Sequence, residues 1–347
     1  MSPTILIAIG GNALIRPSEP PTASAEPTRV AETCRAIGDV VSNGWRVVIT
    51  HGNGPQVGAA LLRSERAAAE AYPLSLDLCV ASTQGEVGYL LQQGLGSELP
   101  ARGVRRPIAT VVTQVVVDPD DPAFTRPTKP IGPFYSTRDI AAHRARGSHP
   151  NALENARRGP LGWTLVEEPP HGWRRVVPSP EPLEIVEESV IRALVDANVV
   201  VITLGGGGIP VVRNADALTG ADAVVDKDLA SALLAKRLQV DRLILATDVD
   251  RIYLDFGTPR ARGLDEVTVE ELARHAAAGQ FAAGSMGPKV DAVVRFVEGF
   301  RREAIVCSLD QLRAALAGRA GTRIFAPASD PQNARRRGAF LDSVGAR

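Results

Sequence analysis

Three glycine-rich stretches follow apolar runs that are typical of buried β-strands. The runs are rich in Ile, Leu and Val, and each ends in neighbouring glycines. The stretches are Gly10-Gly11-Asn12, Gly52-Asn53-Gly54 and Gly205-Gly206-Gly207-Gly208. Because glycine has no Cβ, backbone N–H groups there can line a concavity that suits an anion. A tight turn explains any one stretch equally well, but three that meet at the carboxyl edge of a parallel sheet favour a site for phosphate or another anion.

Lysine is scarce, and its positions are informative. The chain has four lysines, and the other 35 basic residues are arginines. Lys227 and Lys289 stand near predicted helix N-termini, where a cation is unfavourable unless an anion lies nearby. Lys129 lies in a proline-rich segment, whereas Lys236 in "LLAKRLQ" has the pattern of an exposed helix residue. A solvated surface charge is the alternative for Lys227 and Lys289, but their positions favour a role in binding a phosphoryl group.

Aspartates flank one of these lysines in "VVDKDLAS". Asp226 or Asp228 could orient the lysines or hold a magnesium ion through water. No stretch has the Gly-Lys-Ser/Thr ending of a phosphate loop, nor a Gly-x-Gly-x-x-Gly fingerprint after the first strand. In "GGGGIPV", Pro210 would disrupt the helix that a dinucleotide needs. The sequence therefore argues against P-loop NTPases and NAD-binding dehydrogenases.

Composition limits the remaining classes. The 347 residues are 44% hydrophobic with a formal net charge of zero, which fits one large or two smaller α/β domains and predicts neither a nucleic-acid nor a membrane partner. Cys34, Cys79 and Cys307 stand in apolar surroundings, so we expect reduced core thiols and a cytoplasmic location. The five histidines lack metal-ligand spacing, and no stretch approaches the ~18 apolar residues of a membrane span. We therefore expect neither structural zinc nor a histidine triad.

Predicted strands alternate with predicted helices along most of the chain. We expect strands within 4–9, 44–50, 107–118, 199–211, 242–250 and 303–308. We expect helices at 28–42, from 55, at 74–99, at 184–196, from 228, at 288–299 and up to 316. This alternation predicts an α/β fold with a mostly parallel sheet covered by helices on both faces. Segment 118–182 is rich in proline and is predicted to be an inserted lobe or lid, whereas 326–347 has the composition of a disordered polar tail.

Several motifs together resemble those of the carbamate kinases within the amino acid kinase family. They are, in order, "GGNAL", "HGNGPQVG", "TKPIGPFYS", "WRRVVPSPEP", "GGGGIPV", "DKDLASALLA", "TDVD" with "FGTP", and "FAAGSMGPKV". The resemblance runs from about residue 4 to 324 and implies a three-layer α/β/α domain over 1–325, with 118–182 as a lid subdomain, and a homodimer. It also implies reversible formation of ATP and carbamate from ADP and carbamoyl phosphate, with Mg²⁺ on the nucleotide, in the breakdown of arginine or of purine derivatives.

The resemblance assigns roles by motif position. Lys129, Lys227 and Lys289 correspond to the active-site lysines of the family, and Asp228 corresponds to the aspartate that organises them. The residues implied to bind the phosphoryl group and carbamate are Gly10, Gly11, Asn12, Gly52, Asn53 and Gly54. The residues implied to bind the nucleotide are Gly205, Gly206, Gly207, Asp226, Asp248, Tyr253 and Met286. No side chain is expected to bind the metal ion directly.

The expected mechanism needs positive charge and no general base. A carbamate oxygen is already anionic, so the obstacle to attack on phosphorus is repulsion between two anions. We expect Lys227, Lys289 and the N–H groups of Gly10, Gly11 and Asn12 to neutralise the moving phosphoryl group together with Mg²⁺ on the nucleotide.

Two departures from the family pattern bear on closure of the lid or its regulation, and two alternative functions are also open. Pro170-His171-Gly172 and Glu181 differ from the common residues, and both lie in the predicted lid. One alternative is another kinase of the same fold, acting on acetylglutamate, a nucleoside monophosphate or an isoprenyl phosphate. The other is a nucleotide-binding regulator without catalysis.

Overall fold

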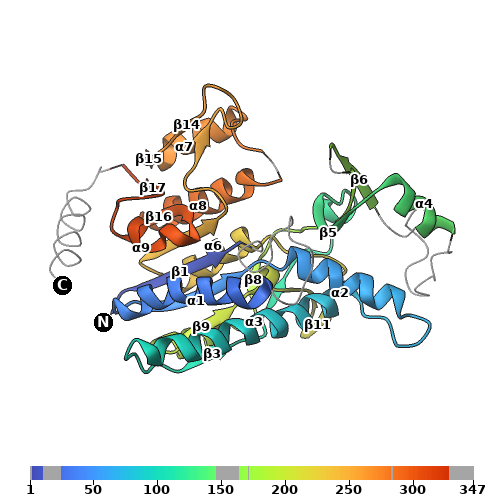
Figure 1. The fold of residues 1–347 in the computed structure, drawn as a ribbon, viewed down its shortest axis with the longest axis horizontal. Helices are drawn as coiled ribbons and strands as arrows, with labels where there is room; N and C mark the ends of the chain where they lie inside the picture. The colour runs from blue at the N-terminus through green and yellow to red at the C-terminus, as the bar shows by residue number, and fades with distance from the viewer. Residues whose placement is uncertain (1, 11–24, 146–163, 171, 283, 328–347) are drawn as a thin grey trace.

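An eight-stranded sheet forms the centre of the molecule. The computed structural model describes residues 2–10, 25–145, 164–170, 172–282 and 284–327. The strand order is β15-β17-β16-β12-β1-β2-β9-β3 (Figure 1). The strands are β1 (Thr4–Ile9), β2 (Arg46–His51), β3 (Ile108–Thr110), β9 (Val200–Thr203), β12 (Arg242–Thr247), β15 (Glu266–Thr268), β16 (Glu303–Ser308) and β17 (Thr322–Phe325). All neighbours run parallel except β16 and β17, so the predicted mostly parallel sheet is confirmed.

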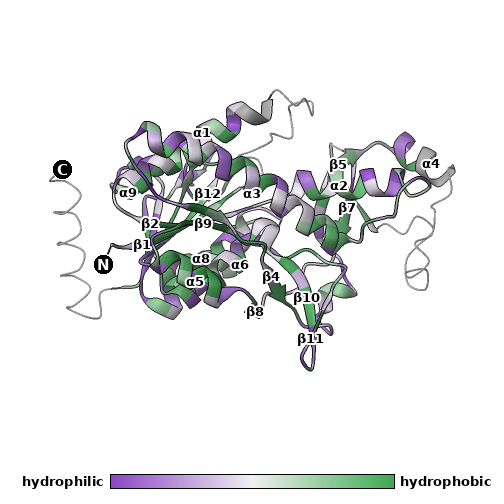
Figure 2. Cartoon of the chain, turned by 90° about the horizontal axis from the view of Figure 1, so that it is seen from below, coloured by the Kyte–Doolittle hydropathy of each residue, from purple (hydrophilic) through white to green (hydrophobic). Residues whose placement is uncertain are grey.

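Strand β1 shows why helices cover both faces of the sheet. Ile5, Ile7 and Ile9 pack into one hydrophobic cluster and Leu6 and Ala8 into another, because successive strand side chains point to opposite faces. Helices on the first face are α1 (Ala25–Ser42), α3 (Leu76–Ala101) and α9 (Leu312–Leu316), and those on the second are α5 (Glu188–Asp196), α6 (Lys227–Leu238) and α8 (Met286–Phe300). Figure 2 shows the two sets on opposite sides of the strands. The three-layer prediction is therefore confirmed.

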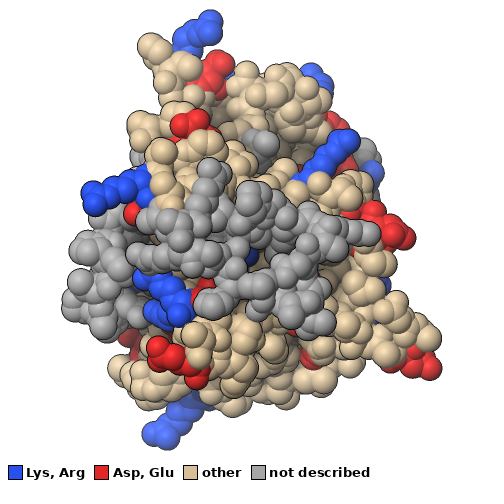
Figure 3. Space-filling model, turned by 90° about the vertical axis from the view of Figure 1, so that its right-hand side faces the viewer, with Lys and Arg blue, Asp and Glu red and all other residues tan. Residues whose placement is uncertain are grey.

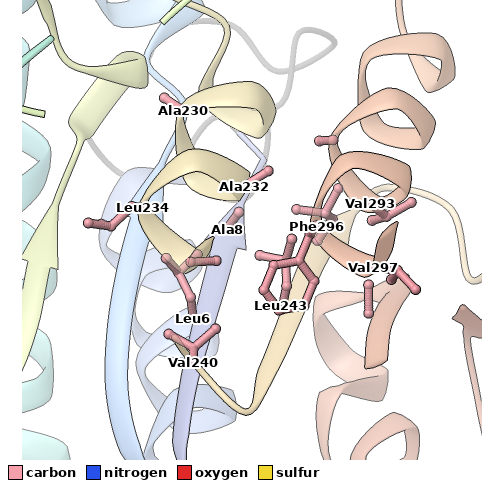
Figure 4. Packing of buried hydrophobic residues seen from close by; sticks show 14 of the residues in the cluster. Leu6, Ala8, Ala230, Ala232, Leu234, Val240, Leu243, Val293, Phe296 and Val297 are labelled. Atoms are coloured by element: carbon pink, nitrogen blue, oxygen red, sulfur yellow. The ribbon is translucent and has the colours of Figure 1, made fainter. Parts of the chain in front are cut away.

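Helices α6 and α8 pack against each other and against the sheet. Phe296 of α8 is fully buried and shares a cluster with Leu234 of α6 and Leu243 of β12 (Figure 4). Burying a side chain of this size contributes about 2–3 kcal/mol. Helix α6 leads into β12 and α8 leads into β16, and these strands are parallel. Both helices therefore begin at the carboxyl edge of the sheet, where ligands of open α/β sheets bind.

Two expected strands are interrupted, which corrects the sequence-based prediction. Segment 107–118 divides into β3 and β4 (Gln114–Val116), and segment 199–211 divides into β9 and β10 (Ile209–Asn214). A short 3₁₀ turn, η3 (Gly205–Gly207), separates the second pair, because Leu204 and the glycines at 206–208 all have positive φ. Strands β4 and β10 belong to a second sheet of order β11-β10-β4-β8, with β8 at Glu184–Ile185 and β11 at Ala217–Gly220.

Other element boundaries also differ from expectation. Helix α5 begins four residues later than predicted, because β8 takes residues at 184–185. Helix α7 (Val269–Ala277) and strands β15 and β17 were not predicted, and neither was the hairpin of β13 (Tyr253–Leu254) and β14 (Arg262–Gly263). The four strands are only two to four residues long, so local patterns signal them weakly.

Segment 118–182 forms a small sheet of its own, away from the central sheet (Figure 1). Its elements are η2 (Pro122–Phe124), β5 (Lys129–Tyr135), α4 (Thr137–Ala145), β6 (Thr164–Glu168) and β7 (Gly172–Val177). The three strands pair antiparallel in the order β5-β7-β6. The described part of the lobe therefore has a sheet of its own, while its status as a separate subdomain and its action as a lid stay predictions. Of the expected polar tail, residues 328–347 lie outside the described part of the chain.

The three cysteines are buried free thiols, as expected. Burial raises the pKa of Cys34 and Cys307 to about 12 and that of Cys79 to about 11. Thiolate is the reactive form of cysteine, so these side chains act as packing groups. Among the described residues, no helix is both long and apolar enough to cross a membrane.

The lobe touches helix α2 (Gly54–Arg66) backbone to backbone. A Cβ atom on Gly58 would lie 2.0 Å from Cα of Gly132 in β5, where the backbone cannot move aside cheaply. We expect Gly58→Ala to displace β5 and to lower the free energy of unfolding by about 1–3 kcal/mol. Gly299→Ala in α8 is the matched control, because its nearest neighbour would be the flexible Lys236 side chain at 3.7 Å. Chemical denaturation measures both variants, and equal stability of the two would contradict the contact.

Candidate active site at the carboxyl edge of the sheet

Helix α6 begins with a capping aspartate. Asp226 Oδ1 accepts hydrogen bonds from the N–H groups of Asp228 at 2.8 Å and Leu229 at 3.3 Å. An aspartate at this position satisfies N–H groups that the first helical turn leaves without partners. The cap fixes Lys227 and Asp228 in the first turn, at the carboxyl edge of the sheet.

A buried carboxylate holds two ammonium groups at this edge. Lys227 Nζ donates to Asp228 Oδ1 at 2.5 Å, and Lys289 Nζ donates to Asp228 Oδ2 at 3.2 Å. Lys289 lies in the first turn of α8, so the pair joins the beginnings of two neighbouring helices. The Asp228 side chain is 4% exposed, which excludes most water from the ion pairs. We call Lys227, Asp228 and Lys289 the lysine bridge.

A third lysine reaches the site from the lobe. Lys129 is the first residue of β5, and its ammonium group forms an ion pair with Asp226 Oδ2. Lys236 instead lies exposed on the third turn of α6. The structure thus brings together the three lysines that the sequence singled out and leaves the fourth apart, as expected.

The cluster has more positive than negative charge. Two carboxylates face three ammonium groups, and the first turns of α6 and α8 add the positive end of their dipoles. Burial alone would raise the pKa of Asp228, but Lys227 and Lys289 outweigh it and hold that pKa well below its usual range. Burial, together with Lys289, lowers the pKa of Lys227, although Asp228 opposes the shift. The site therefore favours an anion. On the face shown in Figure 3, by contrast, charged side chains of both signs are interspersed.

The glycines at 205–207 let two chain segments approach closely. A Cβ atom on Gly205 would lie 2.6 Å from ring atoms of His51, and one on Gly206 would lie 2.2 Å from Asn53 Nδ2. At Gly207 a Cβ atom would lie 2.3 Å from the carbonyl oxygen of Val225, just before the α6 cap. The turn therefore holds the end of β2 against the beginning of α6. Direct contact of Gly205, Gly206 and Gly207 with a nucleotide stays a prediction.

The ends of β1 and β2 are tied together by backbone hydrogen bonds. The N–H of Gly10 donates to the carbonyl of Ala246 at 3.0 Å, and the N–H of Gly52 donates to that of Ile9 at 3.0 Å. The Gly10 N–H is therefore engaged within the sheet, and its expected contact with the phosphoryl group stays a prediction. Gly11 and Asn12 lie outside the described residues.

The residues expected to hold the nucleoside lie beyond β12 and at the start of α8. Asp248 directly follows β12, and Met286 is the first residue of α8, one turn before Lys289. Tyr253 Oη donates to Asp250 Oδ1 at 2.8 Å, and the Tyr253 ring lies 5.9 Å from that of Phe256. Met286 thus shares the first turn of α8 with Lys289, and contact of the three predicted residues with a nucleotide stays a prediction.

Every carboxylate oxygen of the two buried aspartates already has a hydrogen-bond or ion-pair partner. Both oxygens of Asp228 accept from lysines, and those of Asp226 accept from the α6 backbone and Lys129. In the described part of the chain, no three His, Cys, Asp or Glu residues are grouped as a metal site would require.

The sequence analysis missed two buried side chains of this edge. His51 at the end of β2 lies close enough to Lys227 for the two to interact electrostatically, and its Nδ1 contacts the carbonyl oxygen of Gly52 at 3.1 Å. Gln56 lies in the first turn of α2, and neither of its amide atoms has a hydrogen-bond partner. The only sequence signal for either was its position beside the glycines of "HGNGPQVG".

A parallel sheet whose carboxyl edge presents cationic helix N-termini is typical of α/β proteins that bind phosphoryl groups. A model of the amino acid kinase family matches residues 3–308, so the protein belongs to the amino acid kinase family.

Several proteins that are similar over nearly the whole chain are carbamate kinases. That of Thermococcus kodakarensis is 43% identical over 324 residues, covering 92% of this chain and 98% of the relative. The structure of the Giardia lamblia carbamate kinase bound to citric acid has a TM-score of 0.85 at 40% identity, covering 94% of this chain and 99% of the other. The same protein bound to AMP-PNP has a TM-score of 0.83 with the same identity and coverage.

His51 makes stability depend on pH. Its pKa is lowered from 6.5 to about 4, chiefly by burial and in part by the Lys227 charge, while the hydrogen bond to Gly52 opposes the shift. Between pH 6.5 and about 4, the imidazole is protonated in the unfolded chain and neutral in the folded protein. The free energy of unfolding therefore falls as the pH is lowered through this range. From pH 7.5 to 5.0 we expect a loss of about 2 kcal/mol from this residue.

Chemical denaturation of His51→Gln at both pH values tests this expectation. The free energy of unfolding of the variant should not show the loss that His51 causes between pH 7.5 and 5.0. His275→Gln, which alters a partly exposed histidine of α7, should retain it. An identical pH dependence in the native protein and His51→Gln would contradict the assignment.

Proposed function

We propose that this protein catalyses reversible phosphoryl transfer between ATP and carbamate, forming ATP from ADP and carbamoyl phosphate. The observation that carries the proposal is the lysine bridge with Lys129 beside it, at the edge where α/β sheets bind ligands. Identity of 40–43% to carbamate kinases over nearly the whole chain supports the choice of carbamate as the acceptor.

The mechanism follows from charge. Both the transferred phosphoryl group and carbamate are anionic, so the barrier to their approach is mutual repulsion. Lys227 and Lys289 supply compact positive charge at that point, and Asp228 holds both ammonium groups in place before substrate binds. Lys129 adds a third charge from the lobe, so that movement of the lobe would change the charge of the site. No general base is required, because the attacking oxygen is already ionised.

The proposed reaction also requires a nucleotide site and a magnesium ion. An AMP-PNP complex of the Giardia protein supports a nucleotide site, which we assign to Asp226, Asp248, Tyr253, Met286 and the glycines at 205–207. Because the buried aspartates already bind lysines, we propose that Mg²⁺ arrives on the nucleotide phosphates. We also propose a homodimer and a cytoplasmic location, the latter supported by three free, buried thiols.

Formation of ATP from MgADP and fresh carbamoyl phosphate tests the reaction. We expect the native protein to make ATP, and Lys289→Ala to lower kcat by about 100-fold, because one donor to the moving phosphoryl group is lost. Lys236→Ala is the matched control and should stay within about twofold of the native rate, since Lys236 is exposed and distant from the bridge.

Two results would contradict the proposal in different ways. If the folded native protein makes no ATP, the reaction is wrong, and acetylglutamate with ATP becomes the next substrate to test. If ATP forms but Lys289→Ala stays within threefold of the native rate, a change of only about 0.6 kcal/mol in the barrier, the role of the bridge is wrong.

A further inference from the structure

Gln56 is a buried amide without hydrogen bonds. The residue is 4% exposed, and neither Nε2 nor Oε1 has a hydrogen-bond partner among the residues that the structure describes. Leaving such groups buried and unpaired is unfavourable, because the hydrogen bonds that water made to them are not replaced. Gln84 on α3 shows the usual arrangement, because its Nε2 donates to the carbonyls of Thr113 and Gly205 and its Oε1 accepts from the Thr113 N–H. The amide of Gln84 therefore has all its hydrogen-bond partners within the protein. The amide of Gln56 has none among the described residues, and a bound ligand could supply them.

The position of Gln56 indicates where that ligand lies. Gln56 is the third residue of α2, and helical side chains lean toward the helix N-terminus, so its amide lies over the turn that Asn53 and Gly54 begin. Within the described residues, the backbone N–H groups of Gly54 and Gln56 donate no hydrogen bond. A Cβ atom on Gly54 would meet no atom of the described residues within 4 Å, so these residues leave space beside the turn.

This helix end lies beside the lysine bridge. Asn53, the residue before α2, packs against Gly206, and His51 two residues earlier interacts with Lys227. Free N–H groups, the positive end of the α2 dipole and the unpaired amide are therefore next to the proposed phosphoryl position.

We propose that Gln56 recognises the amino group of the carbamoyl moiety and so selects carbamate over other small carboxylates. This inference rests on the proposed function. A carbamoyl group is planar and carries an N–H donor next to an oxygen acceptor. Gln56 Oε1 accepts from that N–H, and Gln56 Nε2 donates to that oxygen. An acetyl group has a methyl where the amino group stands, so it leaves Oε1 unpaired.

The test compares carbamoyl phosphate with acetyl phosphate in Gln56→Met, which is similar in size and lacks the amide. We expect kcat/KM for carbamoyl phosphate with MgADP to fall by about 100-fold. Acetyl phosphate, measured as substrate or as competitive inhibitor, should change less than threefold. The unfolding midpoint should stay equal or rise, because no protein hydrogen bond is lost.

Gln84→Met is the matched control. It should lower the unfolding midpoint, because it removes the bonds to Thr113 and Gly205, while its preference between the two acyl phosphates stays within about threefold of native. If Gln56→Met does not fold, Gln56→Asn gives the same comparison, because it draws the amide back by one methylene.

The outcomes separate this inference from the proposed function. If the native protein makes ATP from carbamoyl phosphate and Gln56→Met keeps the native preference, the assignment of Gln56 is overturned and the proposed function stands. If the native protein makes no ATP from carbamoyl phosphate, the proposed function fails and the assignment of Gln56 fails with it.

Discussion

One buried carboxylate with an ammonium group on each oxygen is the interaction on which the site depends. Lys227 and Lys289 repel each other, and each stands at the positive end of a helix. Without Asp228 between them, burial would drive these charges apart or discharge them. The carboxylate therefore keeps two cations close in a largely water-free place, which is the condition for lowering the repulsion between two anionic reactants.

The fold supplies that condition through the packing of α6 and α8. Each helix leads into one of two neighbouring parallel strands, so both begin at the same edge of the sheet. Phe296 and the residues around it hold the helices together below the bridge (Figure 4). At the edge itself, Gly206 and Gly207 allow the end of β2 to reach the cap of α6. Hydrophobic packing thus fixes the distance between charges that would otherwise separate.

The sequence predicted the layers and the lysines for good physical reasons. Alternating apolar runs identify a covered sheet, and a lysine at a helix N-terminus conflicts with the dipole unless an anion is near. The interruption at Leu204 could not be predicted, because a positive φ at leucine is imposed by surrounding contacts. The hydrogen bond of the Gly10 N–H and the unpaired amide of Gln56 could not be predicted from the sequence either. Each depends on which groups from distant parts of the chain lie next to it in the folded protein.

The most direct test of the account is the pH profile of ATP formation from MgADP and carbamoyl phosphate in Asp228→Asn, which keeps the side-chain shape and removes its charge. We predict a fall in kcat of about 100-fold. We also predict an activity limb at lower pH than in the native protein, because Lys227 would lose the carboxylate that raises its pKa. A folded Asp228→Asn protein with kcat within threefold of native and an unchanged pH profile would contradict the account.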